Sequence, residues 1–334
     1  MQILFGNPYI SVLIGLGLLI VGSHFFIEAT ASTGKKYKIT PIITGLILVG
    51  FATSLPEVFV GVEAAWFDKR TNIAVGNAIG SNIANIGLVV GLTALLFTIK
   101  VQKTKTFTLQ KLFILMCLAV IPPLYLMSDG NDLTENDAII LLLFLVISFF
   151  ALKRIAKKIP SNDPVNVQFS KELNKMEDKS AIKLASVMVI GLLLLLGGAG
   201  VLVEGAIGIA KKFGMSDLVI GLTIVAVGTS LPETAASIAS LIKKKYDYAL
   251  GIIIGSNMFN MLAVLGFPVL ITPVHGLDPG TISRDFAAMI FLTAVFALVL
   301  FCFSRYKITR VEGMVLLLCF VGYQFFIYQS IVGS

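Results

Sequence analysis

Long apolar runs alternate with short polar stretches along almost the whole chain, and the charged residues fall largely between the runs. A helix that crosses a bilayer needs about 20 predominantly apolar residues, and the runs approach or exceed this length. Ten of them are predicted to span a membrane: 10–30, 41–64, 72–97, 108–127, 135–153, 183–208, 218–241, 248–272, 285–304 and 311–330. The pattern therefore predicts an all-α integral membrane protein with ten transmembrane helices.

Composition favours a membrane protein over a soluble domain. Hydrophobic residues make up 57% of the 334 and charged residues only 13%, and the mean hydropathy is +0.93. The first run lacks a preceding basic segment and a clear small-residue cleavage site, so it is predicted as a span and not as a signal peptide. Three cysteines lie inside predicted spans, where they are expected to be apolar fillers: Cys117, Cys302 and Cys319.

Basic residues are distributed unequally between the two sides of the predicted membrane. When the loops are assigned to alternating sides, 21 of the 26 Lys and Arg fall on one side and 5 on the other. The positive-inside rule then predicts a cell (plasma or inner) membrane protein whose Lys-rich side is cytoplasmic and whose termini both lie outside. The net charge of +7 is spread over several loops, which argues against a nucleic-acid partner.

Two pairs of short sequence words indicate an internal duplication. The word Thr-Ser-Leu-Pro-Glu occupies residues 53–57 and 229–233, and the word Gly-Ser-Asn-x-x-Asn occupies 80–85 and 255–260. Shifting residues 28–57 by 176 positions gives 11 identities in 30 without a gap. Because each half has five predicted helices, an odd number, the two halves must have opposite orientations in the membrane.

The predicted organisation follows from this duplication. It consists of a first five-helix repeat (1–153), a cytoplasmic linker (154–182) and a second five-helix repeat (183–334). Inverted repeats of this kind place substrate sites near the membrane midplane, at the repeat interface and on interrupted helices.

The first word places one carboxylate in each half, at Glu57 and Glu233, where a bilayer makes a charge costly. Pro56 and Pro232 lack an N–H, so they release backbone carbonyls in the preceding turn, which must be buried in protein or line a wet cavity. Hydroxyls of the same words complete an all-oxygen set: Thr53, Ser54, Thr229 and Ser230. Such a set suits hard cations, since Ca²⁺ takes about six to eight oxygen ligands, whereas zinc and copper prefer Cys or His.

The second word adds neutral oxygen donors one helical turn apart, which can serve monovalent cations: Ser81, Asn85, Ser256 and Asn260. Glycines at 76 and 80, and at 251 and 255, are expected to let these helices approach the Pro-kinked helices closely. One Pro-kinked helix with a glutamate also fits a purely structural role. Two inverted copies, each with its Gly-Ser-Asn partner, favour an ion site.

These paired words resemble the alpha repeats of the cation/calcium antiporter superfamily, and the chain resembles its prokaryotic sodium/calcium exchanger branch over both halves. The resemblance implies ten helices in two inverted five-helix repeats, with Glu57 and Glu233 as central acids that bind Ca²⁺ and share Na⁺. It also implies a set of surrounding ligands. These are oxygens of Thr53 and Thr229, flanking Na⁺ sites at Ser54, Ser230, Ser81 and Ser256, a middle position at Asn85 and Asn260, and carbonyls of Gly50 and Ala226.

One departure from the family pattern concerns the two asparagines. Some relatives carry an Asp at one of the positions that match Asn85 and Asn260, whereas both are Asn here. This removes one potential negative charge from the site, disfavours a potassium-coupled variant, and prevents the transfer of an ion stoichiometry from the family.

These features predict a secondary active antiporter that exchanges Na⁺ for Ca²⁺ by alternating access at one shared midplane site. The resemblance implies that helices 10–30 and 183–208 slide against a fixed core. The alternative is a proton-coupled calcium or cation exchanger, because two close glutamates can also bind H⁺. A channel would need a continuous pore, and an intramembrane enzyme would need a nucleophile or metal triad, for which the sequence has no motif. The predicted partners are Na⁺, Ca²⁺ and the lipid bilayer, with no cofactor and no enzymatic activity.

Overall fold

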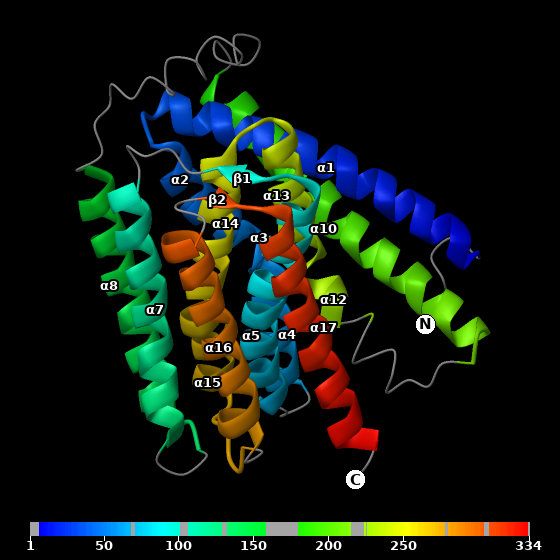
Figure 1. The fold of residues 1–334 in the computed structure, drawn as a ribbon, viewed down its shortest axis with the longest axis vertical. Helices are drawn as coiled ribbons and strands as arrows, with labels where there is room; N and C mark the ends of the chain where they lie inside the picture. Colours follow the sequence, from blue (N-terminus) through cyan, green and yellow to red (C-terminus); the bar gives the residue numbers. More distant parts are fainter. Residues whose placement is uncertain are drawn as a thin grey trace.

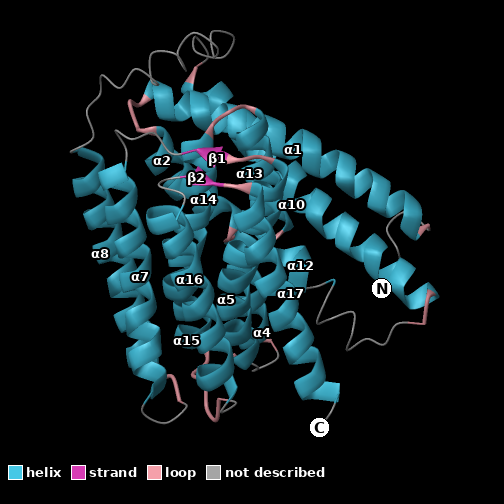
Figure 2. Cartoon of the chain, viewed as in Figure 1, coloured by secondary structure: helices cyan, strands magenta, loops and turns pink. Residues whose placement is uncertain are grey.

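The structure, a computed structural model, describes residues 7–67, 71–100, 106–128, 132–157, 180–214, 224, 226–277, 280–303 and 307–332. Figure 2 shows that these residues are almost entirely helical. The first half contains α1 (Pro8–Lys36), α2 (Pro41–Thr44), η1 (Gly45–Gly50), α3 (Phe51–Thr53), α4 (Leu55–Trp66), α5 (Asn72–Ala84), η2 (Asn85–Val90), α6 (Gly91–Leu96), β1 (Ile99–Lys100), α7 (Thr106–Ser128) and α8 (Glu135–Lys157).

The second half contains a similar series of helices, but its strand lies at a different place in the order. It contains α10 (Ala181–Lys212), α12 (Ala226–Thr229), α13 (Leu231–Ile242), α14 (Tyr246–Phe259), η5 (Asn260–Val264), α15 (Leu265–Ile271), η6 (Thr281–Phe286), α16 (Ala287–Ala297), η7 (Leu298–Phe303), β2 (Lys307–Ile308) and α17 (Arg310–Val332). The segments labelled η are π-helical turns within longer helices. Figure 1 shows the bundle that the helices of the two halves form.

The predicted spans agree with the helices of the described chain. Nine of these helices are long and apolar enough to cross a membrane, and they coincide with nine of the ten predicted spans. Their ends differ by a few residues, as for the first span, predicted over 10–30 and observed as Pro8–Lys36. The start of the span predicted over 218–241 lies largely outside the described residues, and its second part forms α12 and α13. The all-α membrane fold predicted from the sequence is confirmed.

Backbone pairings between the two halves follow the internal duplication. Ile99 in β1 pairs antiparallel with Ile308 in β2, and at the other end of the bundle Leu133 forms a bridge with Val274. Adding 175 to the residue numbers of Ile99 and Leu133 gives Val274 and Ile308. The two contacts are therefore the same contact made once at each end, as expected of two inverted repeats (Figure 1).

The first and sixth predicted spans, now α1 and α10, lie antiparallel along one side of the bundle (Figure 1). Glycines on both helices, at Gly15 and Gly22 of α1 and at Gly191, Gly198 and Gly205 of α10, face the backbone of the partner helix. A Cβ atom at any of them would come closer than 3 Å to that backbone. The two helices are thus in direct backbone contact over much of their length.

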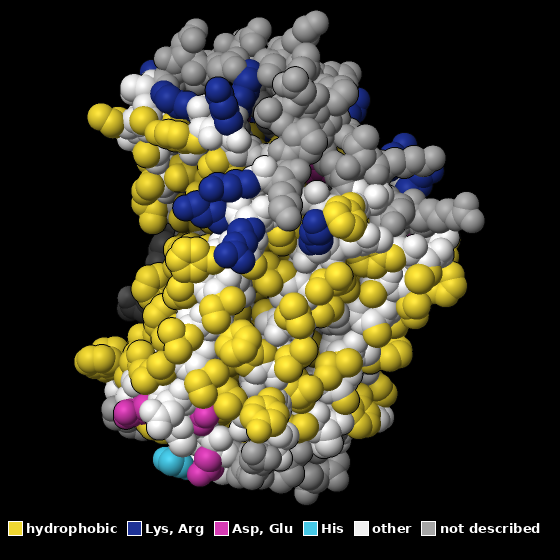
Figure 3. Space-filling view, turned by 90° about the vertical axis from the view of Figure 1, so that its left-hand side faces the viewer, with side chains coloured by type: hydrophobic (Ala, Val, Ile, Leu, Met, Phe, Trp, Pro, Cys, Tyr) yellow, Lys and Arg dark blue, Asp and Glu magenta, His cyan; other side chains and the backbone are white. Residues whose placement is uncertain are grey.

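The surface is divided as a bilayer would require. On the face that Figure 3 shows, Lys and Arg side chains gather toward the upper end, most of the visible Asp, Glu and His side chains lie at the lower end, and a broad hydrophobic band lies between them. Large apolar side chains are correspondingly exposed on outer helices, for example Leu13 at 70% and Phe150 at 63%. We refer below to the upper end, which includes β1, β2 and the turn after α13, as the Lys-rich end (Figure 1).

Candidate functional site

Both Thr-Ser-Leu-Pro-Glu words break a helix at the serine. Ser54 (φ −86°, ψ 3°) separates α3 from α4, and Ser230 (φ −90°, ψ 5°) separates α12 from α13. A proline in the first turn after each break explains where the new half-helix starts, since proline needs no hydrogen-bonded N–H there. Glu57 and Glu233 therefore lie in the first turn of a half-helix, where the helix dipole favours a carboxylate.

The two carboxylates lie inside the protein, each with only 1% of its surface exposed. Ser54 of the first repeat donates a hydrogen bond from Oγ to Oε1 of Glu233 in the second repeat, over 3.3 Å. Ser256 of the second repeat donates from Oγ to the backbone carbonyl of Gly50 in the first, over 3.1 Å. The words of the two halves are thus interleaved in one site at the repeat interface.

The Gly-Ser-Asn-x-x-Asn words carry their last asparagine to the start of a π-helical turn. Asn85 begins η2 and Asn260 begins η5, and both side chains are buried. A π-helical turn widens the helix by one residue and is frequent at functional sites. Ser81, one turn earlier, is also buried and donates to Oδ1 of Asn77 over 3.5 Å, at the limit of a hydrogen bond.

Several buried polar atoms of these residues lack a protein partner among the residues that the structure describes. They are Oε2 of Glu57 and of Glu233, Oγ of Ser230, and both amide atoms of Asn85 and of Asn260. Burying such atoms without a partner costs about 1–3 kcal/mol each, and more for a charge. The described ion pairs include neither glutamate. A bound cation would satisfy the oxygens of this set, so the residues fit an ion site.

The donor set also limits which cation fits. Within the described chain no group of three or more His, Cys, Asp and Glu residues could hold a metal ion. The site instead combines two carboxylates with neutral hydroxyl and amide oxygens, which is the environment of a hard cation and not of zinc or copper.

The remaining predicted ligands are Thr53, Gly50, Thr229 and Ala226. Thr53 is buried, and its hydroxyl donates to the carbonyl of Val49 at 3.0 Å and lies 3.3 Å from that of Gly50. The Gly50 carbonyl therefore receives hydroxyl contacts from Thr53 and Ser256. Thr229 ends α12 and is half-buried, and Ala226 begins the same helix.

The expected close approach at glycines is observed for one of the two pairs. A Cβ at Gly251 or Gly255 of α14 would collide with the backbone of Ile42 or Leu46 in the kinked first-repeat helix. At Gly76 and Gly80, no atom of the described chain lies within 4 Å of such a Cβ. Their counterpart contacts would involve residues 218–222, which lie outside the described residues.

Sequence reasoning missed two asparagines whose side chains join helices at the site, Asn82 and Asn77. Asn82 of α5 donates from Nδ2 to the backbone carbonyl of Asn257 in α14 over 3.1 Å, and both side chains are buried. Asn77 donates to the backbone carbonyl of Glu57 over 3.1 Å. Asn82 and Asn257 are the third residues of the Gly-Ser-Asn words, so their repetition was an available signal.

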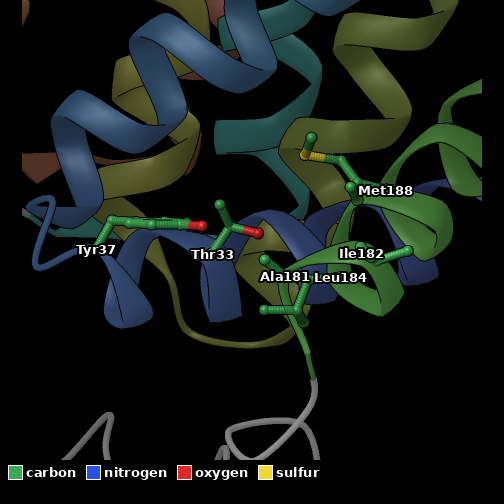
Figure 4. Close-up of a pocket in the computed structure, with 7 residues that line it drawn as sticks. Thr33, Tyr37, Ala181, Ile182, Leu184 and Met188 are labelled. Carbon is green, nitrogen blue, oxygen red and sulfur yellow. The ribbon is translucent and has the colours of Figure 1, made fainter.

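A cavity of about 330 Å³ lies elsewhere, between the end of α1 and the start of α10 (Figure 4). Its lining comes from Thr33 and Tyr37 on one side and from Ala181, Ile182, Leu184, Ala185 and Met188 on the other. This lining is largely apolar and contains no carboxylate, so the cavity is separate from the site built by the repeated words.

Comparisons with known proteins agree with this architecture. The family model described as sodium/calcium exchanger protein matches residues 8–153 and 183–329. The chain is 41% identical over 325 residues to the putative antiporter CaxA of Alkalimonas amylolytica, covering 96% of this chain and 98% of that protein. It is 28% identical to the sodium/calcium exchanger MaX1 of Methanosarcina acetivorans, covering 94% and 97%.

A solved exchanger structure has a similar fold. The sodium-calcium exchanger NCX_Mj, soaked with zero Na⁺ and Ca²⁺, superposes with a TM-score of 0.74 at 27% identity. The match covers 94% of this chain and 96% of NCX_Mj, so it includes both halves and the helices that carry the repeated words.

Proposed function

The chain belongs to the sodium/calcium exchanger protein family, and we propose that it is a secondary active antiporter that exchanges Na⁺ for Ca²⁺ across a membrane. The observation that carries this proposal is the hydrogen bond of Ser54 to Glu233, which brings the acid of one inverted repeat into the word of the other. Inverted-repeat transporters bind their substrates at the repeat interface, and this contact between the two repeats supports a shared pocket there.

The two carboxylates set the charge of the pocket. Glu57 and Glu233 are buried within one site, and a single Ca²⁺ neutralises both. Without a cation, two negative charges would be held in a region of low dielectric, which is costly. The same carboxylates accept Na⁺, so Ca²⁺ and Na⁺ compete for the pocket.

Neutral oxygens complete the coordination of both ions. We assign the centre to Glu57, Glu233, Thr53 and Thr229, and the flanking Na⁺ positions to the serines of the words: Ser54, Ser81, Ser230 and Ser256. Asn85 and Asn260 supply the middle of the pocket, and the carbonyls of Gly50 and Ala226 its outer ligands. The unpartnered buried atoms of Ser230, Asn85 and Asn260 support these assignments.

The moving part in this proposal is the α1–α10 pair. Glycine contacts lock the two helices together, so they move as one unit along the kinked helices. Residues 1–153 and 183–334 are the two repeats, and 154–182 is the cytoplasmic linker. The unequal charge of the two ends supports a cell membrane location with the Lys-rich end in the cytoplasm and both termini outside. The function requires neither a cofactor nor enzymatic chemistry.

Proteoliposomes test the proposal and its alternative together. Purified protein in Na⁺-loaded liposomes should accumulate ⁴⁵Ca²⁺ against its gradient when the outside is free of Na⁺. A channel would only equilibrate Ca²⁺. A proton-coupled exchanger, the alternative that the paired carboxylates leave open, would instead accumulate Ca²⁺ under an imposed pH gradient in the absence of Na⁺.

A further inference from the structure

The two half-helices that carry the glutamates differ in polarity beyond the repeated word. Adding 176 to a residue number converts α4 into α13, so Val58, Gly61 and Ala64 correspond to three hydroxyl residues. These are Thr234, Ser237 and Ser240, all of which are buried. A polar column therefore follows Glu233 along α13 and has no counterpart after Glu57 along α4.

The three hydroxyls are not equivalent. Thr234 donates to the carbonyl of Ser230 over 2.7 Å, and Ser240 donates to the carbonyl of Ala236 over 2.8 Å. Both bonds are made within the same helix. Ser237 is 0% exposed, and its Oγ has no hydrogen-bond partner in the described part of the chain. Because buried hydroxyls are normally paired, this one requires an explanation.

Ser237 shares a helix face with the pocket. Ser230, Glu233 and Ser237 are spaced by three and four residues, which places them on one face of the half-helix. Each contributes a buried oxygen that has no partner among the residues that the structure describes: Oγ of Ser230, Oε2 of Glu233 and Oγ of Ser237. Ser237 is one turn beyond Glu233, and α13 ends with Ile242 next to the Lys243–Lys245 turn at the Lys-rich end.

The position that corresponds to Ser237 in the first repeat is Gly61, where apolar atoms leave little space for a side chain. A Cβ at Gly61 would lie 2.8 Å from Cγ of Pro268 and 3.1 Å from Cβ of Ala74. Pro268, which belongs to the second repeat, corresponds to Thr93 of the first repeat after a shift of 175, so the residue that closes the space at Gly61 is a proline whose counterpart is a threonine. The molecule is thus polar on one side of the pocket and packed with apolar groups on the equivalent other side.

We propose that Ser237 Oγ is a transient ligand for cations that move between the central pocket and the Lys-rich end. This rests on the proposed exchange function. A cation that leaves two carboxylates inside a membrane must exchange its ligands stepwise, because a bare ion in a low-dielectric region is very costly. A hydroxyl oxygen one turn from Glu233 is a suitable hard ligand for both Na⁺ and Ca²⁺. It lowers the barrier to passage without being part of the equilibrium site.

The test compares Ser237→Ala with Ser240→Ala, its matched control one turn further on, whose hydroxyl already bonds within the helix. The apparent KM for Ca²⁺ is measured in everted and in right-side-out vesicles, with the faces assigned by thiol labelling. Ser237→Ala should raise the apparent KM for Ca²⁺ at the Lys-rich face about tenfold. This is the change expected when the cation loses one contact that is about as strong as a hydrogen bond to a charged group. The KM at the other face, equilibrium ⁴⁵Ca²⁺ binding in detergent, and all values for Ser240→Ala should stay within about twofold of wild type.

Three results would overturn the inference: an unchanged KM at both faces, an equal rise at both faces, or a matching loss of equilibrium binding. If Ser237→Ala does not purify as a monodisperse protein, Ser237→Gly, which installs the residue of the first repeat, undergoes the same measurements. Wild-type vesicles that accumulate no Ca²⁺ with Na⁺ would contradict the proposed function instead, so the two failures are distinguishable.

Discussion

Ser54 and Glu233 are 179 residues apart in the chain and are joined by a buried hydrogen bond of 3.3 Å. Each belongs to a copy of the same five-residue word: Ser54 is at the break of its helix, and Glu233 lies in the first turn after the break at Ser230. The inverted duplication therefore produces one composite pocket and not two separate sites. Any substitution in one word is expected to alter ligands supplied by the other.

Neutralising either glutamate should abolish exchange. In Glu57→Gln or Glu233→Gln, the pocket loses one of its two negative charges, worth about 4 kcal/mol per unit of positive charge 4 Å away at an effective dielectric of 20, or about 8 kcal/mol for Ca²⁺. Even half of this energy corresponds to a fall in Ca²⁺ affinity of roughly a thousandfold. Glu63→Gln is the matched control, since Glu63 is exposed on the same half-helix. Equilibrium binding and ⁴⁵Ca²⁺ flux in liposomes measure the effect, and near-normal flux in either pocket variant would refute the assigned site.

Tight packing between α1 and α10 leads to a stability prediction. A Cβ at Gly198 would lie 2.6 Å from the backbone N of Leu19, whereas nothing lies within 4 Å of one at Gly197 in the described chain. Gly198→Ala should therefore destabilise the protein by about 1–3 kcal/mol through overpacking. Gly197→Ala should be neutral or slightly stabilising. Thermal unfolding in detergent compares the two, and equal melting temperatures would show that the helices are not in backbone contact.

The contact between Asp132 and Gly276, at the end of the molecule opposite the Lys-rich end, should depend on pH. The backbone N–H of Gly276 and the side chain of His275 hold the pKa of the Asp132 carboxyl below its ordinary value of 3.8. The ionised form is thus favoured in the folded state, so its stabilisation is fully present above pH 3.8 and is lost as pH falls through the lowered pKa.

Hydrogen exchange of the Gly276 amide measures this contact. Protection should decrease in acid for the wild type, and this pH-dependent part should disappear in Asp132→Ala. If protection of the Gly276 amide depends on pH in the same way in the wild type and in Asp132→Ala, groups other than Asp132 cause the change.

The charge asymmetry predicts the orientation of the molecule. After replacement of the three native cysteines, Ser180→Cys at the Lys-rich end should resist an impermeant thiol reagent in intact cells. Thr134→Cys at the opposite end should react, and both residues are exposed in the structure. Permeabilised cells provide the control for Ser180→Cys. The reverse labelling pattern would invert the topology.

Much of the fold was predictable because a membrane enforces one simple pattern. Spans such as Glu135–Lys157 are continuous apolar helices bounded by charges, and hydropathy detects them directly. The repeated words predicted helix breaks at Pro56 and Pro232, and the structure places these breaks at Ser54 and Ser230. The π-helical turns that begin at Asn85 and Asn260 were not predicted, because one extra residue per turn barely alters an apolar run.

The contents of the site were predictable, but its contacts were not. The words identify Glu57, Glu233 and their hydroxyl neighbours by type and repetition. They do not say that Ser54 contacts the opposite acid, nor that Asn82 and Asn257 join the second words, since these distances depend on how the two halves pack. A role for Ser237 was not predicted for a related reason: the residue stands out only by comparison with Gly61, its counterpart in the first repeat.

Competition between Na⁺ and Ca²⁺ during transport shows whether the two ions share one pocket. The initial rate of ⁴⁵Ca²⁺ uptake into Na⁺-loaded proteoliposomes is measured against external Ca²⁺ at several external Na⁺ concentrations, with ionic strength held constant by choline. External Na⁺ should raise the apparent KM for Ca²⁺ and leave the maximal rate at saturating Ca²⁺ unchanged. A KM that does not change with external Na⁺ would show that the two ions bind independently and would contradict a shared site at Glu57 and Glu233.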